Sequence, residues 1–146
     1  MLGSILVWNT RYGPSLSDML RPSMQTLKHI VVNIHVDKLD DDFLFGIPSE
    51  LEDMRTENII ETVVIQVIVH WKIDESYRRG DVWSRLDKVL TAPGWFSLKR
   101  VSLIIEIANF DNEVELALRK LPELQFPQLS SSNSISFDFK AISYLF

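Results

Sequence analysis

The sequence contains no cysteine, so it forms no disulfide and offers no thiolate for a metal site or for nucleophilic catalysis. Its five glycines are scattered, and none belongs to a glycine-rich loop that could cradle a phosphate. No apolar run approaches the roughly 18–20 residues needed to cross a bilayer, and the apolar N-terminal stretch lacks the basic leader of a signal peptide. These absences predict a cytoplasmic or nuclear protein that makes no membrane contact.

Positive charge is also scarce. The chain has 15 basic and 20 acidic residues, a net charge of -5, which argues against a general nucleic-acid binder. Residues 37–57 carry eight acids and two bases, whereas residues 72–100 carry seven bases and four acids. The basic stretch could attract an acidic partner, and solvated faces between adjacent repeats explain it equally well. Its bases are Lys72, Arg78, Arg79, Arg85, Lys88, Lys99 and Arg100.

What the 146 residues do contain is a repeat, and their 46% apolar content is enough for the core of one domain. Segments 27–36, 60–69 and 98–107 share one pattern at offsets of 33 and 38 residues, and a weaker copy at 135–139 follows after another 34. All are rich in β-branched residues, so each predicts a strand. In that alignment Ser132 stands where the other copies have Leu or Ile.

Alternation along these segments predicts one buried and one partly solvated sheet face. The predicted buried face holds only apolar residues: Ile30, Val32, Ile34, Val36; Val63, Ile65, Val67, Val69; Val101, Leu103, Ile105, Ile107; Ile135, Phe137, Phe139. The opposite face is mixed: Val31, Asn33, His35; Val64, Gln66, Ile68; Ser102, Ile104, Glu106; Ser136, Asp138, Lys140.

Amphipathic helices are predicted between the strands. They cover 49–57 with Pro48 ahead of them, a segment after an Asp81 N-cap, and a segment that begins near Asp111 and ends with the help of Pro122. A shorter stripe precedes Pro22. The chain is therefore predicted to be a single α/β repeat domain over 1–146, with about four helix–strand units and a mainly parallel sheet.

The polar residues on the second sheet face favour helices on one face only, as in a short leucine-rich-repeat-like solenoid. The alternative is an open, doubly wound α/β sheet, whose strands are buried on both faces and run apolar throughout.

The spacing of Leu27, Ile30 and Val32 recurs in the second and third copies and resembles the strand core of leucine-rich repeats. Such repeats continue to an Asn or Cys that forms a ladder behind the strand. The corresponding residues here are His35, Ile68 and Glu106.

Segments 20–28, 83–90 and 93–101 also resemble the degenerate repeat region of mushroom-type fungal F-box proteins: an amphipathic helix, a short loop, a Leu-Lys start and an apolar strand. The resemblance runs from about Ser15 to Phe139 and implies a leucine-rich-repeat-like interaction region, with no catalytic residues. No F-box-like helical segment precedes the repeats.

Three groups of residues raise the question of chemistry. His35, His70 and Asp37 lie at predicted strand ends, where they could ligate Zn²⁺ or transfer protons, but no spaced ligand motif accompanies them. The acidic run 37–42 lacks the alternating ligands and central Gly of a Ca²⁺ loop, so a solvated loop explains it better. The aromatic residues Trp71, Trp83, Trp95 and Phe96 could form a binding hot spot, but they are expected instead to fill the core and anchor loops.

The sequence therefore predicts a non-catalytic interaction or scaffold module that needs no cofactor and no metal. Its protein partner is unidentified, and nucleic acid and membranes are not among the expected partners. The predicted contact surface is the mixed strand face: Asn33, His35, Gln66, Ile68, Ile104, Glu106, Asp138 and Lys140. The alternatives are a small α/β enzyme or metal-binding protein using His35 and His70, and a fragment of a longer F-box substrate adaptor. Uncapped apolar ends would favour self-association or flanking sequence.

Overall fold

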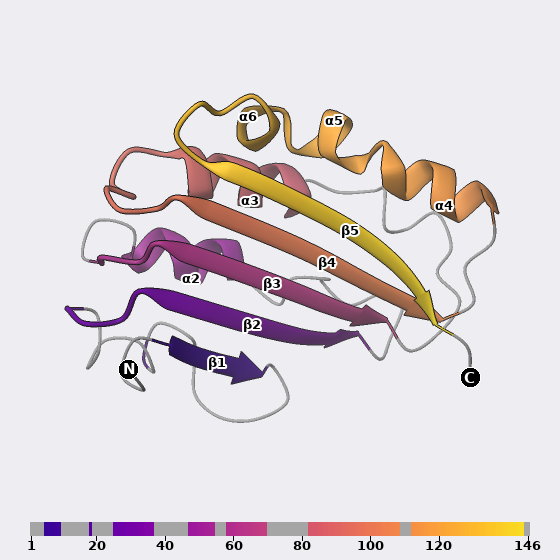
Figure 1. The fold of residues 1–146 in the computed structure, drawn as a ribbon. Coiled ribbons are helices and arrows are strands. Elements are labelled where there is room, and N and C mark those ends of the chain that lie inside the picture. Colours follow the sequence, from indigo (N-terminus) through magenta and orange to yellow (C-terminus); the bar gives the residue numbers. More distant parts are fainter. Residues whose placement is uncertain are drawn as a thin grey trace.

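The computed structural model describes residues 5–9, 18, 25–36, 47–54, 58–69, 82–108 and 112–144. Its centre is one sheet in which five strands run parallel and lie side by side in the order of the chain, β1-β2-β3-β4-β5 (Figure 1). The strands are β1 Ile5–Asn9, β2 His29–Val36, β3 Thr62–Val69, β4 Arg100–Ala108 and β5 Ser136–Tyr144. The α/β class and the parallel sheet are thus confirmed.

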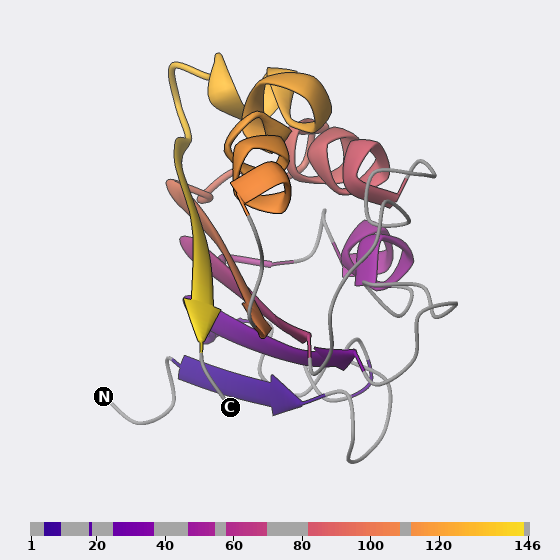
Figure 2. The same cartoon turned by 90° about the vertical axis from the view of Figure 1, so that its right-hand side faces the viewer.

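The helices of the described residues all lie on one side of this sheet, as Figure 2 shows. They are α2 Ile47–Met54, α3 Val82–Thr91, α4 Asn112–Arg119, α5 Leu121–Gln125 and α6 Pro127–Ser130. When parallel strands follow one another in chain order and all crossovers have the same hand, every connecting helix lies on the same face of the sheet. A doubly wound sheet has helices on both faces because its strand order reverses. The described helices therefore have the one-sided arrangement, and the sequential strand order does not fit the doubly wound alternative. None of these helices is long and apolar enough to span a bilayer.

Strand pairing matches the repeat alignment for the first three copies. Ile30 pairs with Val63 and Val63 with Val101, as the offsets of 33 and 38 residues require. The fourth copy is wrong by two residues, because Val101 pairs with Phe137 and not with Ile135. A shift of two keeps every side chain on its predicted face.

The corrected register gives Ser132 a different role from the one expected. It is equivalent to Asn58, since both stand the same distance ahead of a strand. The Asn58 side chain accepts a hydrogen bond from the Ile60 amide at 3.0 Å, and Ser132 Oγ accepts one from the Ser134 amide at 3.2 Å. Both residues therefore shape the turn that enters the strand.

Strand β1 was not predicted from the repeat. Its five residues pair with β2, so that Leu6 lies beside Ile30 and Val7 beside Val31. Leu6 packs against the core and Val7 is exposed, in phase with the inward and outward alternation of β2.

The helix-covered face of the sheet forms the core. Ile30, Val63, Val101 and their inward neighbours are buried almost completely. Each helix presents an apolar stripe to them, as its spacing requires. The buried helical residues include Ile47 and Leu51 of α2, Trp83, Leu86 and Leu90 of α3, and Leu118, Leu121 and Leu129 of α4 to α6. Phe137 and Phe139 on β5 are only half-buried, since no described strand lies beyond β5.

The segment between β4 and β5 holds two helices that were not predicted. α4 ends at Arg119, shortly before Pro122, as expected, and Pro122 itself stands in the first turn of α5, as Pro127 does in that of α6. Proline suits that position because its missing N–H would find no partner within the helix. The Phe126 ring between them packs 5.9 Å from Trp83 and 5.3 Å from Phe137, measured between ring centres, and so joins the helices to β5.

Candidate functional site

The candidate site is the sheet face away from the helices, which we call the open face. Because side chains alternate and the four longer strands are in register, its residues form rows across the sheet. In the order β2 to β5, the rows are Val31, Val64, Ser102, Asp138; Asn33, Gln66, Ile104, Lys140; and His35, Ile68, Glu106, Ile142. All eight residues that the sequence singled out lie in these rows.

The open face is partly exposed along its whole width. Side chains of β2, β3 and β4 on this face are half-buried, and those of β5 are exposed. Its margins carry large apolar groups, with Val7 on β1 59% exposed and Ile142 on β5 42% exposed. No described helix covers this face (Figure 2). Apolar side chains interspersed with polar ones over a continuous surface are typical of protein-binding sites.

Polar groups at the centre of the open face are unequally satisfied. Gln66 Nε2 donates a hydrogen bond to Glu106 Oε1 at 2.9 Å, a diagonal contact between β3 and β4. Asn33 Oδ1 is buried and has no hydrogen-bond partner among the described residues. A buried acceptor without a partner costs free energy, roughly 1–3 kcal/mol, so this amide is a local weakness of the sheet.

Where the strands begin, three charged residues form a ladder across the sheet, which we call the charge ladder. Glu61 lies between Lys28 at 3.8 Å and Lys99 at 3.2 Å. The hydrogen bond from Lys99 and its positive charge lower the pKa of Glu61. Desolvation opposes them, and the charges of Lys28 and His29 lower the pKa to a smaller extent. The main chain is also regular here, because the Lys28 carbonyl accepts the amides of both Glu61 and Thr62, and the Glu61 carbonyl those of Lys99 and Arg100.

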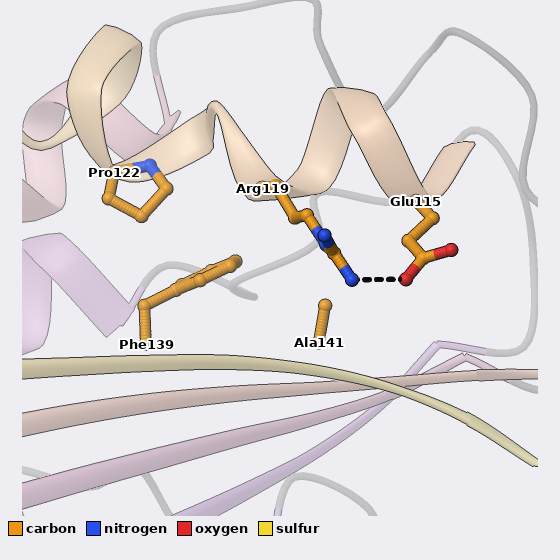
Figure 3. Close-up of a pocket in the computed structure, with 5 residues that line it drawn as sticks. All are labelled: Glu115, Arg119, Pro122, Phe139 and Ala141. Carbon is orange, nitrogen blue, oxygen red and sulfur yellow. Dashed lines mark hydrogen bonds and ion pairs between the residues drawn. The ribbon is translucent and has the colours of Figure 1, made fainter. Parts of the chain in front are cut away.

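Two hollows of about 350 Å³ each open on the helix side. One lies between α2 and α3, where the Arg85 guanidinium is 3.5 Å from Ser49 Oγ. The other, shown in Figure 3, lies between α4 and β5. Its floor is Phe139 and Ala141, and the ion pair of Arg119 with Glu115, at 2.7 Å, closes one side.

Of the three residues in the hypothetical metal or acid–base site, the structure describes only His35. His35 lies on the open face beside Ile68, whereas His70 and Asp37 lie outside the described residues. Within the described ranges, no three His, Asp or Glu side chains are grouped closely enough to hold a metal ion. The acidic run 37–42 also lies outside the described residues.

The basic stretch is divided among different parts of the fold. Arg85 and Lys88 lie on α3, and Lys99 and Arg100 lie at the start of β4, where Lys99 is paired with Glu61. Lys72, Arg78 and Arg79 lie outside the described residues.

The aromatic residues have different environments. Trp83 and Trp95 are buried, and the Trp95 indole donates a hydrogen bond to the Val89 carbonyl at 2.8 Å. Gly94 just before it has a positive φ of 116°, which glycine adopts without strain. Phe96 is 84% exposed, contrary to the expected core role, and Trp71 lies outside the described residues.

A scan against protein-family models, a search of curated proteins and a search of solved structures each returned no match. The resemblance to leucine-rich repeats and to fungal F-box proteins therefore stays a prediction.

Proposed function

We propose that the chain is a non-catalytic protein-interaction module of leucine-rich-repeat-like type, which contacts its partner through the open face. The observation that carries the proposal is the asymmetry of the sheet. On the side of the described helices the inward residues of β2, β3 and β4 are almost completely buried, whereas the other face presents continuous rows of half-buried and exposed apolar and polar residues. Repeat proteins commonly bind partners through such strand surfaces.

The chemistry of the open face indicates what kind of partner would fit. Val64, Ile68 and Ile104 provide apolar area at its centre, while the Gln66–Glu106 hydrogen bond and Asp138 with Lys140 provide polar groups of both signs. A surface of this composition suits a partner with a mixed apolar and polar face better than a polyanion.

Repeat geometry supports the leucine-rich-repeat-like reading, with one departure. Leu27, Ile60 and Leu98 are equivalent residues just ahead of three strands, and all are buried, as the leucine at this consensus position requires. The ladder positions differ, because β3 and β4 continue through Ile68 and Glu106, which leaves both residues on the open face. The alternative function, as a fragment of a longer F-box substrate adaptor, would use the same surface to contact the substrate.

Quantitative capture of partners by proximity labelling in the native cell tests the proposal. The informative variant is Ile68→Glu with Ile104→Glu, which places two charges at the centre of the open face. The matched control is Leu116→Glu with Leu124→Glu, which adds the same charge to exposed apolar residues on α4 and α5. Before the capture experiment, each variant must be shown to have the same thermal unfolding midpoint as the unmodified chain.

We expect the open-face variant to lose the proteins that the unmodified chain enriches, and the control to retain them. Equal enrichment by the unmodified chain and the open-face variant would contradict the proposal. Loss in the control alone would assign the contact to the helix side.

A further inference from the structure

The last strand of the sheet has an unpaired edge. Among the described residues β5 pairs only with β4, along its whole length from Ser136 to Tyr144. An edge strand of this length presents a row of main-chain donors and acceptors that can pair with another strand. In Figure 1 β5 is the last strand of the sheet, at the opposite end from β1 and on the side where α4, α5 and α6 lie.

The hydrogen bonding of β5 shows which residues face outward. The Ser136 amide donates to the Lys99 carbonyl at 2.8 Å, so the main-chain groups of Ser136 point toward β4. Because these groups alternate along a strand, those of Asp138, Lys140 and Ile142 also point toward β4. The outward-facing groups therefore belong to Phe137, Phe139, Ala141 and Ser143.

A second copy of β5 can pair with this edge in an antiparallel manner about a twofold axis. In such a pair, residues whose main-chain groups point outward must lie opposite residues of the same kind in the other copy. The twofold axis then passes between the two copies of one residue, so that this residue lies opposite itself. A centre at Asp138 would place Asp138 against its own copy, and a centre at Lys140 would do the same for Lys140. Like charges directly opposite each other are unfavourable.

A centre at Phe139 gives the complementary arrangement. Asp138 of each copy then lies opposite Lys140 of the other, twice over, on the exposed side of the sheet. These would be the non-hydrogen-bonded pairs, whose side chains approach each other most closely. Phe137, Phe139 and Ala141 would supply the hydrogen-bonded pairs.

The helix side of β5 is also suited to this arrangement. With Phe139 at the centre, the large Phe137 of one copy lies opposite the small Ala141 of the other. The Phe139 side chain of the second copy would then lie next to the hollow of about 350 Å³ beneath α4, which Phe139 and Ala141 of the first copy line (Figure 3). Phe139 and Ala141 are only half-buried in the single chain, so pairing would cover apolar surface that is now exposed.

We propose that the chain forms a symmetric dimer through antiparallel pairing of its β5 strands, centred on Phe139 and fixed by reciprocal Asp138–Lys140 pairs. The two sheets then become one continuous sheet, with both helix layers on one side and both open faces on the other. The readout of this proposal is the oligomeric state, so its outcome is independent of whether the open face binds another protein.

Charge exchange at the two residues tests the register. Light scattering and sedimentation of the unmodified chain at low salt should give a dimer, weakened at high salt because the charge pairs are screened. Asp138→Lys or Lys140→Asp alone should raise the dissociation constant by roughly ten- to a hundredfold, since two attractive pairs become repulsive. The double variant should recover the dimer, and a mixture of the two single variants should form a heterodimer. Glu123→Lys, on exposed α5, is the control for the same change in net charge.

A cysteine scan reads the register directly, because the chain has no cysteine of its own. Phe139→Cys places two thiols opposite each other at a Cα distance of about 5.5 Å, within the range of a disulfide. Mild oxidation should therefore cross-link Phe139→Cys, and should not cross-link Asp138→Cys or Lys140→Cys. Ala141→Pro removes an outward donor without touching the β4 ladder, so it should give a folded monomer.

The proposal is overturned if the unmodified chain is monomeric at all accessible concentrations. It is also overturned if Asp138→Lys and the Glu123→Lys control have the same dissociation constant, or if the cross-link forms at 138 or 140 and not at 139. Near-ultraviolet circular dichroism of each variant separates loss of pairing from loss of folding.

Discussion

The two faces of the sheet differ in how deeply the side chains of the same strands are buried. On the helix-covered face, neighbouring residues such as Val101, Leu103 and Ile105 are almost completely buried. One residue along the chain, Ser102 and Ile104 face the other way and are half-exposed. The covered face therefore contributes more buried apolar surface to the fold, whereas the open face leaves part of its side chains in contact with solvent.

The two sides of the sheet also differ in whether their buried polar groups have hydrogen-bond partners. The buried carboxylate of Asp87, in α3, accepts hydrogen bonds from the main-chain amides of Gln128 at 3.1 Å and Leu129 at 2.8 Å. It therefore caps α6 from another helix, because Phe126 at the N-cap of α6 provides no side-chain acceptor. On the open face, the buried oxygen of Asn33 has no such partner in the described structure. Satisfied polar groups stabilise the covered side, and an unsatisfied one on the open side indicates a surface not optimised for stability alone.

The largest contrast is expected from two adjacent residues of β4. Leu103→Ala removes a fully buried side chain and should lower the free energy of unfolding by about 2–5 kcal/mol. Ile104→Ala, on the open face, should lower it by about 1 kcal/mol or less. Urea unfolding of both variants measures the difference. Equal losses would mean that the open face is packed as tightly as the core in solution, contrary to the comparison.

The second effect concerns the cap of α6. Asp87→Ala leaves the amides of Gln128 and Leu129 without their acceptor and should cost about 1–3 kcal/mol of unfolding free energy. The control is Ser84→Ala on the same helix, which loses one partly buried hydrogen bond to Gln125 and should cost about 1 kcal/mol or less. Thermal or urea unfolding distinguishes them. If Ser84→Ala lowered the free energy of unfolding as much as Asp87→Ala does, the cap would contribute no more than one partly buried hydrogen bond.

The faces of the sheet could be predicted from the sequence because alternation in the repeats is local and consistent. Even the fourth copy, shifted by two residues, kept its side chains on the predicted faces. Its register was misjudged because Ile135 resembles the strand residue Val101, although Ser132 belongs with the turn residue Asn58. Strand β1 was missed because Ile5 pairs with His29, an offset of 24 residues that departs from the repeat offsets of 33 and 38.

Contacts between distant residues could not be predicted in this way. The cap that Asp87 provides for α6 joins residues more than 40 positions apart and has no local signal. Pro122 and Pro127 suit the first turn of a helix as well as the end of the preceding one, so the local sequence alone left both possibilities open. Rows of the open face followed from parity, but the diagonal hydrogen bond of Gln66 required the actual strand pairing.

A gain in stability is expected at the unsatisfied amide of the open face. Asn33→Val removes the unpaired oxygen and adds a β-branched residue to a strand, so it should raise the unfolding free energy by about 1 kcal/mol. The control Gln66→Val removes a paired amide from the same row and should lower it by about 1 kcal/mol. Urea midpoints measure both. Destabilisation by Asn33→Val would show that its amide is satisfied in solution, for instance by ordered water.

The smallest effect is expected at the charge ladder, on the margin of the sheet, where solvent weakens ion pairs. Because Lys99 and Lys28 lower the pKa of Glu61, its ionised form favours the folded state. That contribution is fully present above the pKa of glutamate in the unfolded chain, and it is lost as the pH falls through the lower pKa of the folded chain. Glu61→Gln should therefore have its effect on the urea midpoint at neutral pH and lose it in acid. Glu123→Gln, an exposed glutamate on α5, is the control for a change of charge alone. An effect of Glu61→Gln that persists undiminished in acid would mean that the ladder acts by packing and not by charge.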